Sequence, residues 1–338
     1  MRILGIETAC DDTGIAVVED GHRVLANVVA SQVGTHSRYG GVVPELAARR
    51  HVENVLYVLD LALEEASADL GSLDAVAVNC KHGLLRSVAV GVAAAKSLAY
   101  ALEVPLIGVH HVEAHLYSAL IEQPDLEFPL ISLAVAGGHN LLIEMADHGR
   151  YEIIGRTLDD AAGEAFDKVA RRLGLPFPGG PVLSRLAAEG DPHAIPFPRP
   201  LLDSHDLNFS FSGLKTAVSV LIDSYPSLDS VPVADVAASF QEAVVDVLVA
   251  KTLRGAQERR ARTVTVVGGV AANARLREVF NERGHALGIE CLFPKREYCT
   301  DNGAMVASLG WYRYRAGDTA GLDLDARART HFAPIAGE

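Results

Sequence analysis

An internal repeat constrains the fold of this chain more than any other feature. The segment "ILGIETACDDTGIAVVEDGHRVLANVV" near the N-terminus and the segment "PLISLAVAGGHNLLIEMADHGRYEIIGRT" in the middle follow one pattern. In each, an apolar run enters a turn rich in Gly or Asp, a second apolar run leaves it, and another turn follows at Asp20-Gly21 or His148-Gly149. Helical patterns follow both meanders. The repeat predicts a duplicated α/β fold, with two unrelated hairpins as the alternative.

Composition limits the classes of function that the chain can have. Its 338 residues, 49% of them hydrophobic, suit two domains or one large duplicated unit. The formal net charge of −13 excludes a general basic surface, so a nucleic-acid substrate would need a local basic patch or a partner protein. The four cysteines form no C-x-x-C pair, which excludes a zinc knuckle or a redox motif. The absence of a signal peptide and of any run of 18 apolar residues predicts a cytoplasmic protein without a membrane span.

Three segments between and after the repeats have helical periodicity. Residues 43–66 and 159–175 carry apolar residues at helical spacing with charge on the other face, and residues 85–102 are apolar nearly all round, which predicts a buried helix. Further on, "TVTVVGGVAANARLREVF" predicts a strand that ends in two glycines before a helix from about Asn273. Such a junction is typical of an anion or nucleotide site.

The stretch "VHHVEAHLY" raises the possibility of a metal site. In a helix, His111 and His115 would lie at i and i+4 on one face, which is how a helix offers two imidazoles to one metal. The zinc-protease pattern H-E-x-x-H requires Glu at position 112, where this chain has Val112, and Glu113 would point to the opposite side. The protease interpretation is therefore rejected, and a solvated helix face or a helix cap remains the alternative.

A third ligand would make the histidine pair a metal site. Asp301 in "YCTDNGAMVASLGW" precedes an apolar helix, and two histidines with one carboxylate can hold Fe²⁺ or Zn²⁺ with open positions. Asp301 could equally cap that helix. Sequence alone does not bring residues 111 and 301 together.

Two turns of the repeats also have the composition of a ligand site. Asp11 and Asp12 lie in the first turn of the first meander, where a carboxylate can act as a base or the turn can approach a phosphate. Ordinary turn chemistry explains them equally well. The glycine-rich turns in "AVAGGHN" and "FPGGP" are compatible with close approach of a ligand to the backbone.

These pieces occur together, in order and over almost the whole chain, in one family. The chain resembles the bacterial and archaeal-eukaryotic tRNA N6-adenosine threonylcarbamoyltransferases, which were formerly labelled O-sialoglycoprotein endopeptidases. The matching segments are "GIETACDDTG", "RYGGVVPELAARRH", "HHVEAH", "GGH", "DDAAGEAFDKVARRLGLPFPGGP", "NFSFSGLKTAV", "GGVAANARLR" and "CTDNGAMVA".

The resemblance implies a duplicated actin/Hsp70-like fold of the ribonuclease H-like (ASKHA) class, with two lobes and a cleft. The first lobe is expected over residues 1–108, with a C-terminal tail of about 310–338 packed on it. The second lobe is expected over 109–309, with an inserted helical region of about 158–235.

The resemblance also implies a set of site residues. The metal ligands of the family fall on His111, His115 and Asp301, and a catalytic proton acceptor is expected at Asp11. The residues expected to bind the substrate adenylate are Ala134, Val135, Ala136, Gly137, Gly138, Asp167, Gly180 and Asn273.

The implied reaction transfers the threonylcarbamoyl group of threonylcarbamoyl-AMP to N6 of adenosine 37 in tRNAs that read codons beginning with A. One divalent metal is expected, Fe²⁺ first and Zn²⁺ as the alternative, with threonylcarbamoyl-AMP, ATP or AMP in the cleft. The expected partners are tRNA, a smaller paralogous subunit of the same fold and a small ATPase.

The chain departs from the family pattern at three places. It has "NCKHGLLRSV" where the family usually reads "SGPGLVGSL", it has Ala136 and Asn140 where the family usually reads "SGGHT", and Asp12 replaces a glutamate. These departures leave open a diverged paralogue that passes a carbamoyl-type group to another acceptor. A non-catalytic partner subunit is a further alternative, although such subunits lack the histidine pair that this chain retains.

Overall fold

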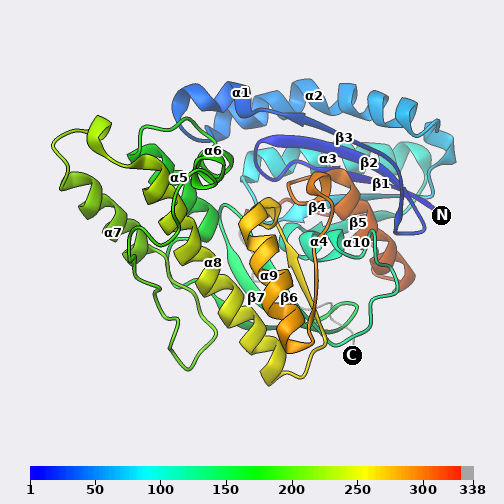
Figure 1. Cartoon of the computed structure of the whole chain (residues 1–338). Helices are drawn as coiled ribbons and strands as arrows, with labels where there is room; N and C mark the ends of the chain where they lie inside the picture. The colour runs from blue at the N-terminus through cyan, green and yellow to red at the C-terminus, as the bar shows by residue number, and fades with distance from the viewer. Residues whose placement is uncertain (329–338) are drawn as a thin grey trace. The chain divides into compact units, whose positions relative to one another are not determined.

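The structure is a computed structural model that describes residues 1–328 and divides the chain into two compact units (Figure 1). The first unit comprises Met1–Leu126 and the C-terminal segment from Pro294, and the second comprises Glu127–Phe293. The last part of the expected C-terminal tail, residues 329–338, lies outside the described residues. The two units are described separately below.

The first unit is built on a five-stranded mixed sheet in the order β3-β2-β1-β4-β5. β1 pairs antiparallel with β2, which pairs antiparallel with β3, whereas β4 and β5 continue the sheet in parallel. The strands are β1 (Arg2–Glu7), β2 (Asp12–Glu19), β3 (Arg23–Ser31), β4 (Ala75–Lys81) and β5 (Leu106–His110). Asp20 and Gly21 both take positive φ in the β2–β3 turn, as a tight hairpin requires.

The second unit repeats this sheet, and this confirms the duplicated α/β fold. Its strand order is β8-β7-β6-β9-β10, with the first two pairings antiparallel and the last two parallel. The strands are β6 (Leu130–Val135), β7 (Asn140–Asp147), β8 (Arg150–Arg156), β9 (Thr263–Val267) and β10 (Glu290–Leu292). Each meander that the sequence predicted therefore opens one sheet.

Helices cover both faces of the first sheet. Leu4 and Ile6 of β1 share a core with residues of α2 (Pro44–Glu65) and α3 (Leu85–Leu102). Gly5, which alternates with them along the strand, meets α10 (Gly303–Arg315) instead. Because successive strand residues point to opposite faces, α2 and α3 lie on one side of the sheet and α10 on the other. Two short helices complete this unit: α1 (Val33–His36) and α4 (His111–Ser118).

Residues 85–102 form the predicted helix, but only one of its faces is buried, so the prediction of a buried helix is wrong for the other face. α3 is long and apolar enough to cross a membrane by length and composition, but only 33% of it is buried. One face of the helix, which includes Val88 and Val92, packs into the core with β4. The exposed positions of the helix include Ala89, Ala93 and Ala101 and the larger Leu85 and Tyr100, so apolar character alone carried little information about which positions are buried. Because the face with Val88 and Val92 packs into the core of the first unit, we interpret α3 as a core helix rather than a membrane span.

The helices of the second unit lie between β8 and β10. α8 (Val233–Glu258) is the longest and is buried on most of its circumference. The helices α5 (Ala162–Arg172), α6 (Gly179–Ala187) and α7 (Ser212–Asp223) precede it, and α9 (Ala274–Leu287) follows β9. Figure 1 shows α5 to α7 grouped in the green part of the chain.

The boundaries between the units differ from those expected for the lobes. The sequence analysis assigned residues 109–309 to the second lobe, but α4 and the start of α10 belong to the first unit. The physical reason is that α4 packs against α10, and both contact β4 and β5.

Three glycines allow α10 to approach β1 and β2 closely. A Cβ atom on Gly5 would lie 2.2 Å from the carbonyl oxygen of Gly303, and one on Gly303 would lie 2.4 Å from the Ala16 nitrogen. A Cβ atom on Gly14 would lie 2.9 Å from the Gly303 nitrogen. Backbone therefore contacts backbone at this crossing, and the crossing fixes where the residues just before α10 lie.

We predict that Gly5→Ala lowers the free energy of unfolding by about 1–3 kcal/mol, because the added methyl group overpacks the crossing of β1 and α10. Denaturant unfolding of the metal-free protein measures this change. Gly34→Ala is the control, because nothing lies within 4 Å of a Cβ at that helical position. Equal stabilities of the two variants would contradict the prediction.

Candidate functional site

The structure brings together two histidines and one carboxylate within the first unit. His111 and His115 lie on α4, and Asp301 immediately precedes α10. The Nε2 atoms of His111 and His115 lie 3.6 Å and 3.3 Å from Asp301 Oδ1. One possible ligand atom from each residue falls within 4.8 Å of the others. These three residues form a group that can hold a metal ion.

Helix caps set where the segments that carry the three candidate ligands begin. His110 ends β5, and its Nδ1 accepts a hydrogen bond from the Val112 N–H, so that α4 begins at His111. The cap of α10 belongs to Asn302, whose Oδ1 accepts from the Met305 N–H. Asp301 therefore does not cap this helix, which was the alternative explanation for it.

Glu7 is a candidate site residue that the sequence analysis did not select. Its side chain is fully buried, and its Oε2 accepts a hydrogen bond of 3.0 Å from His111 Nδ1. Its Oε1 accepts from the Ala9 N–H at 2.6 Å and from Asn79 Nδ2 at 3.1 Å. Because Nδ1 donates to Glu7, the lone pair of His111 lies on Nε2, the nitrogen that faces Asp301.

The charges around His111 favour a cation in this group. Burial alone would lower the pKa of His111, but the carboxylates of Asp301 and Glu7 raise that pKa to about 9. A divalent ion would displace this proton, and the same two carboxylates would stabilise the charge of the ion. Two imidazoles, one carboxylate and a carboxylate behind one imidazole fit a divalent transition metal. Asp301 is 23% exposed, which leaves one side of the group accessible.

The turn that carries Asp11 and Asp12 is held by a buried histidine. His51 of α2 accepts at Nδ1 from the Thr13 hydroxyl (2.8 Å) and donates from Nε2 to the Cys10 carbonyl (3.1 Å). Burial raises the pKa of Asp11, and Asp301 raises it further. Burial likewise raises the pKa of Asp12, to about 7. The carboxyl groups in this turn therefore release protons at a higher pH than ordinary aspartates.

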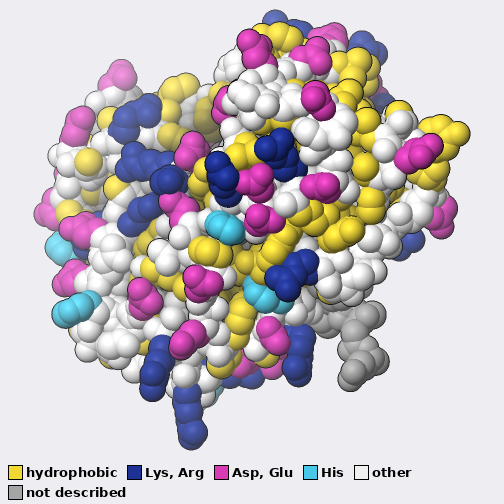
Figure 2. Space-filling view, turned by 90° about the vertical axis from the view of Figure 1, so that its right-hand side faces the viewer, with side chains coloured by type: hydrophobic (Ala, Val, Ile, Leu, Met, Phe, Trp, Pro, Cys, Tyr) yellow, Lys and Arg dark blue, Asp and Glu magenta, His cyan; other side chains and the backbone are white. Residues whose placement is uncertain are grey.

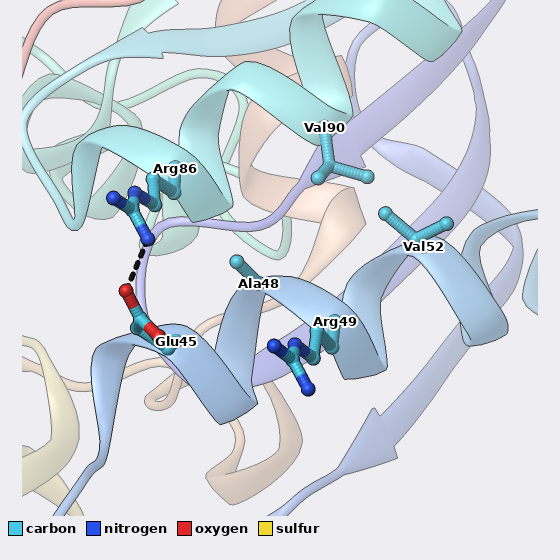
Figure 3. A pocket seen from close by; sticks show the side chains of 6 residues that line it. All are labelled: Glu45, Ala48, Arg49, Val52, Arg86 and Val90. Atoms are coloured by element: carbon cyan, nitrogen blue, oxygen red, sulfur yellow. Dashed lines mark hydrogen bonds and ion pairs between the residues drawn. The ribbon is translucent and has the colours of Figure 1, made fainter.

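Arg86 and His82, two residues of the departing segment "NCKHGLLRSV", have different surroundings. Arg86 forms an ion pair with Glu45 across a pocket of about 210 Å³ between α2 and α3, which is also lined by Ala48, Arg49, Val52 and Val90 (Figure 3). His82 instead lies beside the metal-binding group, with its ring centroid 6.0 Å from that of His111.

In the second unit, the expected substrate-binding loop spans the end of β6 and the following turn. Ala134 and Val135 are fully buried strand residues, whereas Gly137 and Gly138 are exposed. Nothing lies within 4 Å of a Cβ at either glycine. Backbone atoms of the turn are therefore open to a ligand, while the side chains of the strand residues are not.

The other expected substrate-binding residues are connected to this turn through α5 and α6. The Gly163 N–H of α5 donates to the Ala136 carbonyl at 3.3 Å. Further along α5, Asp167 Oδ1 accepts from the Gly179 and Gly180 N–H groups at 2.8 and 3.2 Å. Burial raises the pKa of Asp167. Asn273 caps α9 with its Oδ1 and donates from Nδ2 to Ser184 of α6.

The structure gives a role to one motif whose function the sequence did not indicate. The Asp159 carboxylate accepts hydrogen bonds from the Ser210 and Ser212 hydroxyls and from the backbone N–H groups of Phe211 and Ser212. The neighbouring Asp160 binds both Lys168 and Lys215. The segment "NFSFSGLK" is thereby fixed to the start of the α5 region.

Comparison with known proteins identifies the family. The family model described as tRNA N6-adenosine threonylcarbamoyltransferase matches residues 23–308. The protein of that name from Moorella thermoacetica is 53% identical over 96% of this chain and 95% of its own length. This chain belongs to the tRNA N6-adenosine threonylcarbamoyltransferase family. The protein of the same name from Symbiobacterium thermophilum is 52% identical over 96% of this chain and 95% of its own length.

Solved structures outside this family share the fold. Full-length HypF in its phosphate- and nucleotide-bound form aligns with a TM-score of 0.61 at 14% identity over 97% of this chain and 47% of that one. The activator of 2-hydroxyisocaproyl-CoA dehydratase from Clostridium difficile with bound ADPNP aligns with a TM-score of 0.55 at 13% identity over 94% of this chain and 97% of that one. These neighbours are actin/Hsp70-like, so the fold of this family member is of the ASKHA class.

We predict that Glu7→Gln weakens metal binding about 10- to 100-fold, the usual effect of changing an outer partner of a metal-bound histidine. A glutamine offers one acceptor oxygen, so it cannot accept from His111 and from the Ala9 N–H with separate oxygens, as Glu7 does. Competition titration with a chromogenic chelator measures the dissociation constant. Glu45→Gln is the matched control on the surface, and equal constants for both variants would contradict the role of Glu7.

We predict that Asp12 makes the metal-free protein less stable as the pH rises. The pKa of Asp12 is about 7 in the folded protein, against its usual 3.8, so between these values the folded state holds a proton that the unfolded chain has released. Stability falls with pH wherever the folded state binds more protons. Urea unfolding at about pH 5 and about pH 8 should show a smaller loss of stability for Asp12→Asn than for the unchanged protein. Equal losses of stability in the variant and the unchanged protein would show that Asp12 does not cause the pH dependence.

Proposed function

We propose that this protein transfers the threonylcarbamoyl group of threonylcarbamoyl-AMP to N6 of adenosine 37 in tRNAs that read codons beginning with A. The observation that carries the proposal is family membership over residues 23–308 together with the group of His111, His115 and Asp301. The retained ligand group distinguishes this assignment from a non-catalytic subunit of the same fold.

We propose that His111, His115 and Asp301 hold one divalent ion, Fe²⁺ first and Zn²⁺ as the alternative. When bound, such an ion supplies Lewis acidity toward a carbonyl or phosphate oxygen of the donor. Glu7 keeps the lone pair of His111 on Nε2, and the partly exposed Asp301 leaves the open side on which a substrate oxygen can bind.

We propose that Asp11 accepts the proton from the adenine amine. N6 forms a bond to the carbamoyl carbon, the bond from that carbon to the phosphate oxygen breaks, and AMP leaves. The N6 proton must be removed during this exchange because an acylated, protonated amine would expel its new group. Burial raises the pKa of Asp11 above that of an ordinary carboxyl group, which makes its carboxylate a stronger base.

We propose that the second unit binds the adenylate of the donor. The exposed backbone of Gly137 and Gly138 suits a phosphate, because N–H groups without side chains nearby can approach its oxygens. The Asp167 carboxylate retains acceptor capacity for ribose hydroxyl groups beside its bonds to Gly179 and Gly180. Ala136 and Asn273 complete this set, while Ala134 and Val135 contribute through their backbone.

We propose that partner proteins supply part of the tRNA-binding surface, in a cytoplasmic complex with a smaller paralogous subunit and a small ATPase. Acidic side chains lie among the basic ones on the face shown in Figure 2, and the formal net charge of the chain is −13. A polyanion would be bound poorly by such a surface alone.

We predict that deletion of the gene abolishes threonylcarbamoyladenosine in tRNA, as measured by nucleoside analysis of bulk tRNA. A copy with His115→Ala should fail to restore the nucleoside, because it removes one of three metal ligands, whereas Glu45→Gln should restore it. Unchanged threonylcarbamoyladenosine after deletion would overturn the assignment and favour a diverged paralogue with another acceptor.

A further inference from the structure

We propose that His82 is a positioning residue of the metal centre, whose imidazole holds the ring of His111 in its metal-binding orientation. The inference deepens the proposed function, on which it rests for the presence of a metal. His82 lies in the segment where the family usually has Gly-Pro-Gly. Neither glycine nor proline has an aromatic ring, so this chain differs from the family pattern in having one here.

The rings of His82 and His111 are stacked. Their centroids lie 6.0 Å apart and their planes differ by 6°, which is within the range of offset aromatic stacking. The His82 ring is also 5.6 Å from that of His110, the residue that caps α4. His82 thus contacts both the metal ligand and the residue that starts its helix.

The backbone of His82 adopts a conformation that glycine would take more easily. Its φ is 72°, in the left-handed region, where histidine is tolerated at a cost. Two hydrogen bonds hold it there: its N–H donates to the Arg327 carbonyl at 2.9 Å, and its carbonyl accepts from Asn79 Nδ2 at 3.2 Å. The same Asn79 amide donates to Glu7, so one side chain ties His82 to the partner of His111.

The turn that follows His82 is anchored to the same region. The Leu84 N–H donates to the Ala9 carbonyl at 2.7 Å, and a Cβ on Gly83 would lie 2.5 Å from that oxygen. The Ala9 N–H in turn donates to Glu7. The backbone that carries the His82 ring is therefore held by the network that also holds the buried carboxylate of Glu7.

Glu7, His115 and His82 restrict different motions of the His111 ring. Glu7 holds the Nδ1 atom, which leaves the ring able to tilt about that hydrogen bond. His115 meets the ring at 81° with centroids 4.7 Å apart. His82 lies parallel to the ring and blocks tilting toward its side. Because a metal bond requires the Nε2 lone pair to point at the ion, limiting the tilt strengthens binding and fixes the ligand geometry.

The test is titration of the purified, metal-free protein with Co²⁺ alone, followed by its visible absorption bands. His82→Gly should raise the Co²⁺ dissociation constant about tenfold and shift the bands, because the freed His111 ring changes the ligand field. The unfolding free energy of the metal-free variant should not fall, since glycine relieves the left-handed backbone. Glu103→Gly is the matched control: Glu103 also has a left-handed φ, of 56°, at the C-terminal cap of α3.

His82→Phe separates stacking from other roles. A phenyl ring keeps a stacking face but has no nitrogen, so affinity and spectrum should stay close to those of the unchanged protein. If His82→Phe instead behaves like His82→Gly, or if His82→Gly binds Co²⁺ as the unchanged protein does with the same bands, the proposal is overturned. The titrations contain no tRNA and so do not depend on the acceptor of the reaction. If the acceptor is not tRNA, the proposed reaction is overturned, but the role of His82 in metal binding is still supported.

Discussion

The close approach of α10 to β1 and β2 is the constraint on which the metal-binding group depends. Gly5, Gly14 and Gly303 meet there with no room for a Cβ atom, so the helix axis lies nearer to the sheet than ordinary side chains permit. The residues just before α10 are carried to α4 by this crossing, and the cap at Asn302 sets the direction in which Asp301 leaves the helix. A packing interaction between backbones, rather than an interaction between charges, therefore assembles the three ligands.

A second layer of the site is a buried polar network around Glu7. A buried carboxylate is costly unless each oxygen has partners, and here one oxygen binds His111 while the other binds the Ala9 N–H and Asn79. Asn79 extends the network to the carbonyl of His82. The buried carboxylate at the end of β1 is thus stabilised by its own partners and favours a cation beside His111.

Equivalent turns of the two sheets carry residues of different electrostatic character. In the first unit, Asp11 ends the β1–β2 turn and Asp12 begins β2, and partial burial raises the pKa of both carboxyl groups. In the second unit, the β6–β7 turn contains the exposed Gly137 and Gly138. Carboxylates suit proton transfer near a cation, and open backbone N–H groups suit a phosphate. A duplicated topology offers the same turn twice, and the residues in each turn decide which charge it receives.

Much of the fold was predictable from sequence because its signals are local. Alternation of apolar residues and paired turn residues revealed both meanders, and the i, i+4 spacing revealed His111 and His115 as one helix face. Burial of α3 was misjudged, because its exposed face also carries apolar residues, among them Leu85 and Tyr100. Glu7 went unselected, since a charged residue inside a strand gives no local sign of its partner.

The sequence by itself determined the repeat, the helix face with two histidines and the membership of a family. Only the tertiary structure decided that Asp301 joins those histidines, that Asn302 rather than Asp301 caps α10, and that His82 stacks on His111. The physical reason is distance along the chain. Hydrogen bonds within a turn or a helix depend on neighbouring residues, whereas the meeting of residues 111 and 301 depends on how closely a helix can approach a sheet.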